Sequence, residues 1–584
     1  MSVTRSRSGP CTTLTALLAT SALVLAGCGG DSPSPEQQFA DAMASGNVQA
    51  AADLTSDPAA ASAAITALFD GLDERERSFT VAQEGDSFTL DADWDFGEDR
   101  GWQYSTTGKI VSVSGEQRLS WDPALLVPGL GADETVRFTP TAGPPPVVRA
   151  STGEPIMMQQ VVTLVNLQPS ADPAAVAPLL TPIVPTITVD SLRGDLAKAG
   201  GQPITAITLR ENDITPVRKR LEALTGVELV QQTRLLTVDR ALASPVLGGL
   251  ADLWQQGQDA SAGWAVQMVG ADGSVRRLAG QDGTPAPDLD TTLDLRLQMK
   301  AENALAGVPQ PAVIVALQPS TGAVLAVAQN APADAQGSIA LTGLYPPGST
   351  FKTVTTSAAL QAGKVTPDTV LPCPGTENVE GRQIPNDDNF DLGSVPLHSA
   401  FAQSCNTTMA RLAVSLPPDA LSQAALQFGL GIDYVTPGLT TVTGSVPAAS
   451  TPAERVESAI GQGQVTASPF GMALVAASIA NGTTPSPMMI AGRPGVGDKS
   501  VAAVPAAVDA ALRSMMRETV TDGTAKILAD LPNIEGKTGT AEYGDGTDSH
   551  GWFVGIDRDL AFAVFVAGAD SSGPALDAAG RFLR

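Results

Sequence analysis

Three short groups of polar residues in the C-terminal half of the chain have the types and order needed for serine-based nucleophilic catalysis. In chain order they are Ser349 with Lys352, Ser404 with Asn406, and Lys537 with Thr538, Gly539 and Thr540. A serine hydroxyl is a poor nucleophile until a neighbouring base takes its proton. Any one of these groups is common by chance and alone indicates only a surface serine or a solvated lysine, so the prediction depends on the ordered set.

The residues around Ser349 predict a turn followed by a helix. Residues 345–348 read Tyr-Pro-Pro-Gly, and the stretch from Ser349 to Leu360 has a helical pattern. On a helix, positions three apart share a face, so the Lys352 amine is expected near the Ser349 hydroxyl. Lys352 can act as the base if burial and a nearby positive charge favour its neutral form, and Lys537 would supply that charge. The helix N-terminus would direct free backbone N–H groups toward the reacting carbonyl.

A predicted edge strand carries the third group. Residues 536–541 have the pattern of a strand beside a cleft, and Gly539 would let a substrate backbone approach closely. Lys537, Thr538 and Thr540 offer the positive charge and hydroxyl donors that bind a carboxylate. The segment therefore indicates a substrate that ends in a free carboxyl group.

Composition argues against several other functions. The net charge of −26 would repel phosphate backbones, so nucleic acid is not expected as a partner. The two histidines, His398 and His550, and the four cysteines are too few for a zinc site, and no metal or cofactor is predicted. Both histidines are expected to be structural or surface residues. The run Gly461-Gln462-Gly463 is not followed by Lys-Ser or Lys-Thr, so it does not indicate a phosphate-binding loop.

The N-terminus has the pattern of a secretory signal. Arg5 and Arg7 precede an uncharged apolar run over residues 12–26, which is short for a membrane-spanning helix. An uncleaved helix or a core helix is the alternative interpretation. The following Leu-Ala-Gly-Cys28 resembles a bacterial lipobox, which implies a lipid on Cys28 as the only anchor. We therefore expect a signal peptide over residues 1–27 and a flexible tether over 28–35.

Two cysteines would remain in the exported protein, Cys373 and Cys405. Disulfides persist outside the cytoplasm, and a bridge between them would close a loop of about 30 residues. Two separate buried thiols are an equally weighted alternative, because sequence alone does not fix the geometry.

The length of 584 residues predicts two to four domains. A helical, alanine-rich segment followed by alternating apolar and polar residues up to about 140 predicts a small α+β domain over residues 36–143. Three prolines mark a linker, and residues 144–287 mix short strands with helices, among them an amphipathic helix over 217–224.

Residues 288–584 form the predicted catalytic domain. Its apolar segments 312–317 and 323–328 read as a β-hairpin, and 551–556 and 560–566 read as two closing strands before a final helix from about Pro574. The predicted fold is thus multidomain α+β, ending in an antiparallel sheet flanked by helices.

At these residues the chain resembles the class B penicillin-binding proteins. The resemblance covers residues 288–584 and rests on Tyr-Pro-Pro-Gly-Ser-Thr-Phe-Lys352, the Ser404 and Lys537 groups, Ala-Ile-Gly-Gln-Gly463 and Trp-Phe-Val-Gly555. It implies a serine-type peptidoglycan D,D-transpeptidase in which Ser349 attacks the D-Ala–D-Ala carbonyl of a stem peptide. Lys352 would be the base and Ser404 would relay a proton to the leaving D-alanine.

The resemblance assigns further roles. Asn406 would hydrogen-bond the substrate backbone, and the N–H groups of Ser349 and Thr540 would form an oxyanion hole. An amine would release the acyl-enzyme as a cross-link, and β-lactams would acylate Ser349. Implied partners are stem peptides, a glycosyltransferase and proteins of the divisome or elongasome, at the extracytoplasmic face of the cell membrane.

The upstream half resembles the methicillin-resistance type of transpeptidase, with a cone-like, nuclear-transport-factor-like domain over 36–143 and a pedestal, or dimerisation, domain over 144–287. The usual Asp-Arg-Asn-Gly turn is replaced by Ser-Thr-Gly-Glu at 151–154. The family mostly uses a spanning helix, whereas the lipobox indicates a lipoprotein.

Other functions share the three motifs. A β-lactamase would be a single compact domain with a deacylating Glu-x-x-Leu-Asn loop, which is not found between Asn406 and Lys537. A D,D-carboxypeptidase differs only in its acyl acceptor and stays open. A β-lactam sensor would need a signalling segment that spans the membrane, and a non-catalytic binding module should have lost a motif residue.

Overall fold

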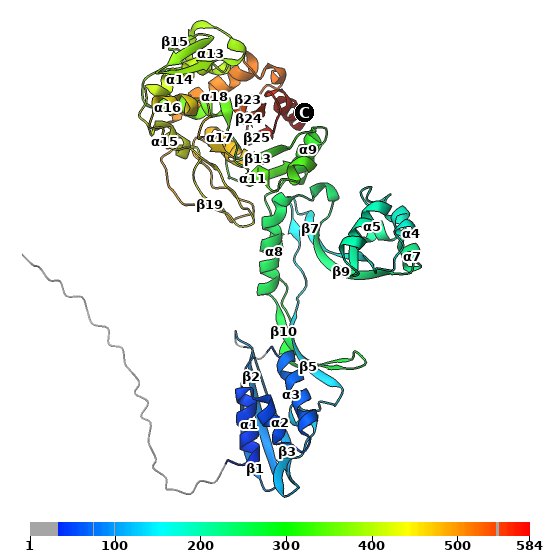
Figure 1. Cartoon of the computed structure of the whole chain (residues 1–584). Coiled ribbons are helices and arrows are strands. Elements are labelled where there is room, and N and C mark those ends of the chain that lie inside the picture. The colour runs from blue at the N-terminus through cyan, green and yellow to red at the C-terminus, as the bar shows by residue number, and fades with distance from the viewer. Residues whose placement is uncertain (1–32, 74, 99, 545–547) are drawn as a thin grey trace, which may run out of the picture. The chain divides into compact units, whose positions relative to one another are not determined.

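The computed structural model describes residues 33–73, 75–98, 100–544 and 548–584. The predicted signal peptide, Cys28 and most of the tether lie outside these residues. Among the described helices, none combines the length and the apolar composition needed to cross a membrane. The chain divides into two compact units (Figure 1): one joins the described residues up to Thr141 with Trp264–Gln281, and the other joins Ala142–Gly263 with Asp282–Arg584.

The first unit is an α+β layer of three helices and an antiparallel sheet. The helices are α1 (Pro35–Ser45), α2 (Val48–Asp53) and α3 (Pro58–Gly71), and the sheet runs in the order β1 (Glu76–Glu84), β2 (Ser87–Asp95), β3 (Gly101–Val113) and β4 (Glu116–Leu119). Alternate residues of β2, from Phe88 to Trp94, are buried against helix residues such as Phe39 and Ile65. Period-two burial of this kind is what the alternating sequence predicted.

A second, three-stranded sheet completes this unit in the order β11 (Val275–Gln281), β10 (Gly263–Gly270) and β5 (Glu134–Thr141). Trp264, Val266 and Met268 of β10 belong to the same core as Phe39. From the sequence, residues 264–281 are expected to belong to the 144–287 domain. The structure differs because the hairpin pairs with a strand more than a hundred residues upstream, and alternation alone does not name a strand's partner.

The second unit begins with a five-stranded sheet. Its order is β12 (Leu289–Asp290), β6 (Val148–Arg149), β7 (Pro155–Leu167) and β8 (Ile204–Arg210), with β9 (Val227–Thr237) also paired to β7. The helices here are α4 (Pro173–Leu180), α5 (Val189–Lys198), α6 (Glu211–Ile214), α7 (Arg218–Glu222) and α8 (Gly248–Ala260). The amphipathic helix predicted over 217–224 is thus present, in the shorter form of α7.

The C-terminal part is built on an antiparallel sheet of five strands. Their order is β14 (Val324–Gln329), β13 (Ala312–Leu317), β25 (Leu560–Val566), β24 (Asp548–Asp557) and β23 (Ile534–Tyr543). The predicted hairpin and closing strands are all present, and β23 lies at the sheet edge as expected. Successive side chains of β13 enter different cores: Ile314 packs with α9 (Leu295–Leu305) and α19 (Gly573–Leu583), and Val315 packs with α17 (Pro469–Asn481).

Among the remaining elements, the turn that carries Ser349 and helix α18 (Ala506–Thr521) pack against the edge strand β23. The nucleophile segment forms a 3₁₀ turn, Gly348–Phe351, that continues into α12 (Lys352–Gln361). The other helices are α10 (Ala331–Asp334), α11 (Ile339–Thr342), α13 (Leu397–Ala402), α14 (Asn406–Val414), α15 (Ala420–Gln427), α16 (Pro452–Ala459) and α18 (Ala506–Thr521). Short strand pairs are β15 (Val370–Cys373) with β18 (Gly393–Pro396), β16 (Thr376–Val379) with β17 (Arg382–Pro385), β19 (Tyr434–Val435) with β22 (Val496–Gly497), and β20 (Gly444–Ser445) with β21 (Thr466–Ala467).

Candidate active site

The turn that carries Ser349 packs directly on the edge strand β23. A Cβ atom at Gly539 would lie 2.9 Å from the Pro347 carbonyl oxygen and 3.1 Å from the Thr350 nitrogen. Gly348 has a φ of 53°, and a Cβ there would lie 2.5 Å from the Thr540 carbonyl oxygen. Glycine is therefore required on both sides of this contact, for space at Gly539 and for space and conformation at Gly348. Contact with the Ser349 turn is thus a second reason for glycine at position 539, besides the close substrate approach expected from the sequence.

Ser404 lies between the two lysines and joins the three groups of residues. Lys352 Nζ donates to Ser404 Oγ at 3.0 Å, and Lys537 Nζ donates to the same oxygen at 3.1 Å. Lys352 Nζ also donates to the Ser404 carbonyl and to Asn406 Oδ1, each at 2.6 Å. The fold thus brings together residues from α12, from the segment before α14, from the first position of α14 and from β23.

Burial sets the protonation of both lysines. Lys352 and Lys537 are fully buried. Desolvation, followed by repulsion from Lys537, holds the pKa of Lys352 well below its usual value, while Asp387 acts weakly in the opposite direction. Desolvation lowers the pKa of Lys537 to about 7. Burial and the neighbouring charge therefore favour the neutral, basic form of Lys352, for the two physical reasons that the sequence suggested.

Ser404 adopts a backbone conformation that is uncommon for its residue type. Its φ is 64°, in the left-handed region, and it follows the end of α13, where Ser404 N donates to Phe401 O and Cys405 N donates to Ala400 O. This helix ending turns the Ser404 carbonyl and hydroxyl toward Lys352. Left-handed non-glycine residues cost free energy and persist only where the surroundings hold them, which is common at functional sites.

Asn386 is a residue that the sequence analysis missed. It is 2% exposed, and its Oδ1 accepts hydrogen bonds from the backbone N–H groups of Asn406 at 2.8 Å and Thr407 at 3.2 Å. Helix α14 has no side-chain cap from its own N-cap residue, so Asn386 caps it from a distant loop. Its Nδ2 donates to the carbonyls of Pro374 and Phe390, both at 2.9 Å. A lone asparagine far from α14 in sequence gave no local signal of this role.

A disulfide also joins the residues before Asn386 to the start of α14. Cys373 and Cys405 have their sulfur atoms 2.13 Å apart and their Cα atoms 6.2 Å apart, so the structure contains the bridged alternative. Thr407 Oγ1 and Thr408 Oγ1 donate to the carbonyls of Pro374 and Pro372. The residue between Ser404 and Asn406 is therefore tied to strand β15.

A cleft of about 1060 Å³ opens above these groups. Predicted site residues that line it are Ser349, Ser404, Asn406, Thr538 and Thr540, whereas Lys352 and Lys537 are buried beneath. Acidic side chains also line the cleft, namely Asp387, Asp388, Glu457 and Glu542. Asn406 Nδ2 donates to the Pro385 carbonyl at 2.8 Å, and its second N–H hydrogen can serve a ligand.

The outer edge of β23 faces this cleft. With its amide turned so that nitrogen meets the Glu542 carbonyl, Gln462 bonds the backbone of Glu542, at 3.2 Å to its oxygen and 2.8 Å from its nitrogen. Because backbone groups two residues apart on a strand point the same way, the N–H and C=O of Thr540 and Thr538 also point away from β24. Thr538 Oγ1 lies 2.6 Å from Thr524 Oγ1, which contributes a further hydroxyl to the cleft.

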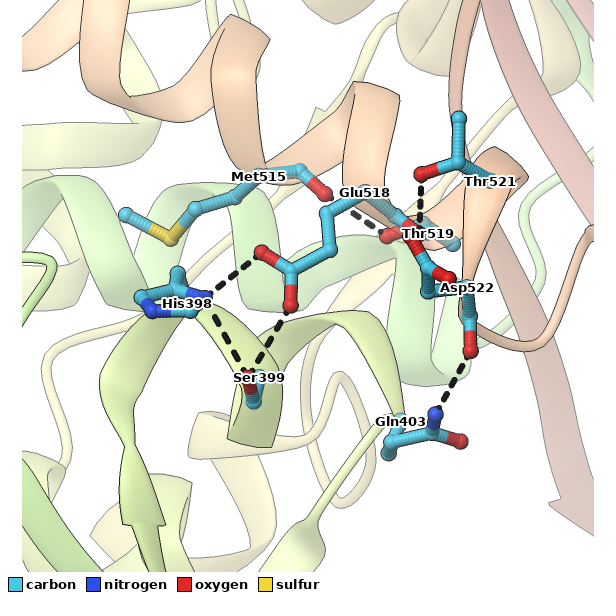
Figure 2. Close-up of polar contacts among 8 residues, drawn as sticks. All are labelled: His398, Ser399, Gln403, Met515, Glu518, Thr519, Thr521 and Asp522. Atoms are coloured by element: carbon cyan, nitrogen blue, oxygen red, sulfur yellow. Dashed lines mark hydrogen bonds and ion pairs between the residues drawn. The ribbon is translucent and has the colours of Figure 1, made fainter.

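The two histidines lie outside this polar centre. His550 stacks on Tyr543 with ring centroids 4.1 Å apart, accepts from Gly568 N, and has its pKa lowered to about 4 by burial. His398 contacts Glu518 across the interface of α13 and α18 (Figure 2). Over the described residues, no group of three His, Cys, Asp or Glu side chains could hold a metal ion.

Comparison with known proteins identifies the family of the C-terminal domain. Residues 312–583 match the penicillin binding protein transpeptidase domain. The chain is 32% identical over 352 residues to peptidoglycan D,D-transpeptidase PbpA of Mycolicibacterium smegmatis, which covers 51% of this chain and 70% of that protein. The chain belongs to the class B penicillin-binding transpeptidase family. The family assignment made from the sequence is confirmed.

Other family members show similar coverage. PbpA of Mycobacterium tuberculosis is 30% identical over 332 residues, covering 48% of this chain and 66% of that protein. Peptidoglycan D,D-transpeptidase MrdA of Acinetobacter baumannii is 28% identical over 341 residues, covering 48% and 50%. The chain thus spans about two thirds of the mycobacterial relatives. Among solved structures, Pseudomonas aeruginosa PBP2 in complex with WCK 5153 covers 52% of this chain and 79% of its own, at 29% identity and a TM-score of 0.47.

Proposed function

We propose that this chain is a serine-type peptidoglycan D,D-transpeptidase with Ser349 as its nucleophile. The observation that carries the proposal is the Ser404 hydroxyl, bonded to Lys352 and Lys537 at the floor of the cleft that Ser349 lines. In this arrangement Lys352 would be the base for Ser349. Ser404 would be the proton relay, and Lys537 would supply the buried charge. Named relatives of the family are peptidoglycan D,D-transpeptidases.

Acylation follows from the protonation of Lys352. A neutral Lys352 has two hydrogens, which its two 2.6 Å contacts to Ser404 O and Asn406 Oδ1 can use. Its lone pair is then available to take the Ser349 proton as Ser349 Oγ bonds to the penultimate D-alanine carbonyl carbon. The outward N–H of Thr540, together with that of Ser349, would stabilise the oxyanion.

Release of the leaving group is the role proposed for Ser404. Once Lys352 has taken the Ser349 proton, the Ser404 oxygen accepts hydrogen bonds from both lysines, which leaves its own hydrogen free to be donated into the cleft. The C–N bond to the terminal D-alanine breaks as Ser404 gives that nitrogen a proton and regains one from Lys352. Thr538, Thr540 and Lys537 would bind the carboxylate of this residue.

The second half-reaction distinguishes the two remaining activities. An acceptor amine attacks the Ser349 ester, a new C–N bond forms, the C–O bond breaks and Ser349 regains its proton. With water as acceptor the same site would be a D,D-carboxypeptidase. β-Lactams would acylate Ser349 by the first step alone.

Labelling with a fluorescent penicillin tests the nucleophile. Ser349→Ala should abolish labelling while the thermal transition is retained, and persistent labelling of that variant would remove Ser349 from the mechanism. Incubation with stem peptides then tests the acceptor. Mass spectrometry should detect a cross-linked dimer, whereas D-alanine loss without a dimer would make the chain a carboxypeptidase.

We further propose that the exported chain is a lipoprotein, with the first unit as a nuclear-transport-factor-like domain and residues 144–263 and 282–287 as a pedestal. The α+β layer of the first unit and the Leu-Ala-Gly-Cys28 sequence support this. Proposed partners are stem peptides, β-lactams, a glycosyltransferase and divisome or elongasome proteins at the extracytoplasmic membrane face. Cys28→Ala should move the protein from the membrane fraction to the soluble fraction, and unchanged fractionation would contradict the anchor.

A further inference from the structure

Helices α13 and α18 end at two different walls of the catalytic cleft. The chain reaches Ser404 two residues after α13 ends at Ala402. After α18 it reaches Thr524, which contacts Thr538 of β23. The two helices pack against each other along α13. Their relative position therefore sets the position of Ser404 relative to the strand that carries Lys537.

One carboxylate holds the first turn of α13 to α18. Glu518 Oε2 lies 2.6 Å from His398 Nδ1, and Ser399 Oγ donates to Glu518 Oε1 at 3.0 Å (Figure 2). With Glu518 ionised, His398 must carry its hydrogen on Nδ1 to donate in this contact. The Glu518 and His398 side chains are 26% and 32% exposed, so solvent only partly screens the contact.

The backbone of Glu518 also ends its own helix. The Glu518 carbonyl accepts from Asp522 N at 2.8 Å and from Gly523 N at 3.0 Å. The next residues bond the far end of α13, since Gln403 Nε2 donates to Asp522 O at 2.8 Å and Thr524 N donates to Ala402 O at 3.2 Å. A Cβ at Gly523 would lie 2.3 Å from Ala402 O, so the two backbone segments meet without room for a side chain at this position.

We propose that Glu518 is a positioning residue for acylation, acting through His398 and Ser399 to fix α13 and thereby Ser404. Its side chain holds the start of α13, and the helix ending that it forms holds the end of α13. Ser404 lies two residues beyond Ala402 in a left-handed conformation that depends on its surroundings. Glu518 touches none of the reacting groups, so its effect is indirect. The inference rests on the acylation of Ser349 proposed above.

The expected effect is large for a residue outside the cleft. Hydrogen bonds around a catalytic centre must be held within about 0.5 Å, and a displacement of about 1 Å can cost about 100-fold in rate. Glu518→Ala removes both contacts to α13 and should slow acylation by a fluorescent penicillin about 10-fold to 100-fold per active site. Glu518→Gln can still accept from Ser399 and can donate to His398 in its other tautomer, so it should recover most of the rate.

The experiment measures the acylation rate constant per titratable site, and its pH profile, in the full chain. Because Ser404 contacts Lys352, displacement of Ser404 should also shift the pH midpoint of the rate in Glu518→Ala. Asp530→Asn is the matched control, since Asp530 forms an exposed ion pair with Arg584 away from the cleft, and its rate should be unchanged.

A role in stability alone predicts a different result. Glu518→Ala would then lower the fraction of titratable sites, while the rate per site and the pH midpoint stayed at the wild-type values, and the proposal would be wrong. If Glu518→Ala does not fold, Ser399→Ala serves instead. It removes only one of the two contacts of Glu518 with α13, so it should slow acylation, but by less than is expected for Glu518→Ala. Retained labelling of Ser349→Ala would overturn the nucleophile assignment, whereas an unchanged rate in Glu518→Ala would overturn only the positioning role.

Discussion

Lys537 is a buried amine whose charge has consequences beyond catalysis. Its Nζ donates to Ser404 Oγ and to the Thr538 carbonyl, and the side chain is fully buried beneath the cleft. Burying an ammonium group costs free energy unless partners compensate. For Lys537 desolvation lowers the pKa, so its buried side chain loses its proton more readily than an exposed lysine. The burial that lowers the pKa values of Lys352 and Lys537 therefore also makes folding depend on pH.

The pH dependence of stability has a definite sign. The pKa of Lys537 falls from 10.5 to about 7 on folding. Between these values the unfolded chain holds a proton that the folded chain has lost, so the free energy of unfolding rises as pH increases from about 7 to about 10.5. Lys537→Met removes this contribution, and its stability should rise less steeply with pH. Lys352 contributes in the same direction, so some slope should remain.

Urea denaturation at several pH values between 7 and 10 measures this difference. The wild-type and Lys537→Met curves should diverge toward high pH. Equal slopes would show that Lys537 keeps its proton in the folded protein. Lys526→Met is a suitable control, because Lys526 lies in a 3₁₀ turn after α18 rather than in the cleft.

Helix α14 shows how an element can be positioned by residues far from it in sequence. It starts at Asn406 without a cap of its own, and Asn386 supplies the missing acceptor. The disulfide from Cys405 to Cys373 and the bonds of Thr407 and Thr408 join the same helix turn to the segment before Asn386. These contacts fix the start of α14, and with it the Asn406 side chain that accepts from Lys352.

Asn386→Ala should both destabilise the domain and slow acylation. Loss of a helix cap costs about 1 kcal/mol, and leaving buried N–H groups unpaired costs about 1–3 kcal/mol. Asn386→Asp keeps the acceptor at a helix N-terminus, where a negative charge is favourable, but loses the donor to Pro374 and Phe390. Chemical denaturation and the acylation rate per titratable site should place Asn386→Asp between wild type and Asn386→Ala. A wild-type rate in Asn386→Ala would contradict the role in positioning Asn406.

Much of this architecture could be predicted from the sequence, and the reasons differ between elements. The hairpin of β13 and β14 and the strand β23 follow from apolar runs and local glycines, which act over a few residues. The three groups of candidate site residues, which the structure brings together, could be predicted because their order and spacing are distinctive. Asn386, Glu518 and Gln462 were not predicted, since each acts on a segment distant in sequence and has no local pattern. The pairing of β10 with β5 was missed for the same reason.

The chain leaves its first unit after Thr141 and returns to it at Trp264. The returning hairpin contributes Trp264, whose ring centroid lies 5.5 Å from that of Phe96 and 6.2 Å from that of Phe138. The core of this unit therefore includes residues that follow the first part of the second unit in the sequence. The candidate site residues all belong to the second unit, which has its own cores.

Trp264→Ala in the full chain tests whether the two units are stabilised separately. Trp264 is 9% exposed, and truncating a buried tryptophan costs about 3–5 kcal/mol. In this variant the thermal transition of the first unit should move to a lower temperature. Labelling of Ser349 by a fluorescent penicillin should continue at the wild-type rate, because the cleft residues share no core with Trp264. Trp254→Ala is the matched control, since Trp254 packs in the second unit and donates to Pro146 O at 2.7 Å. A loss of labelling in Trp264→Ala equal to that in Trp254→Ala would show that the catalytic domain depends on the first unit for its stability.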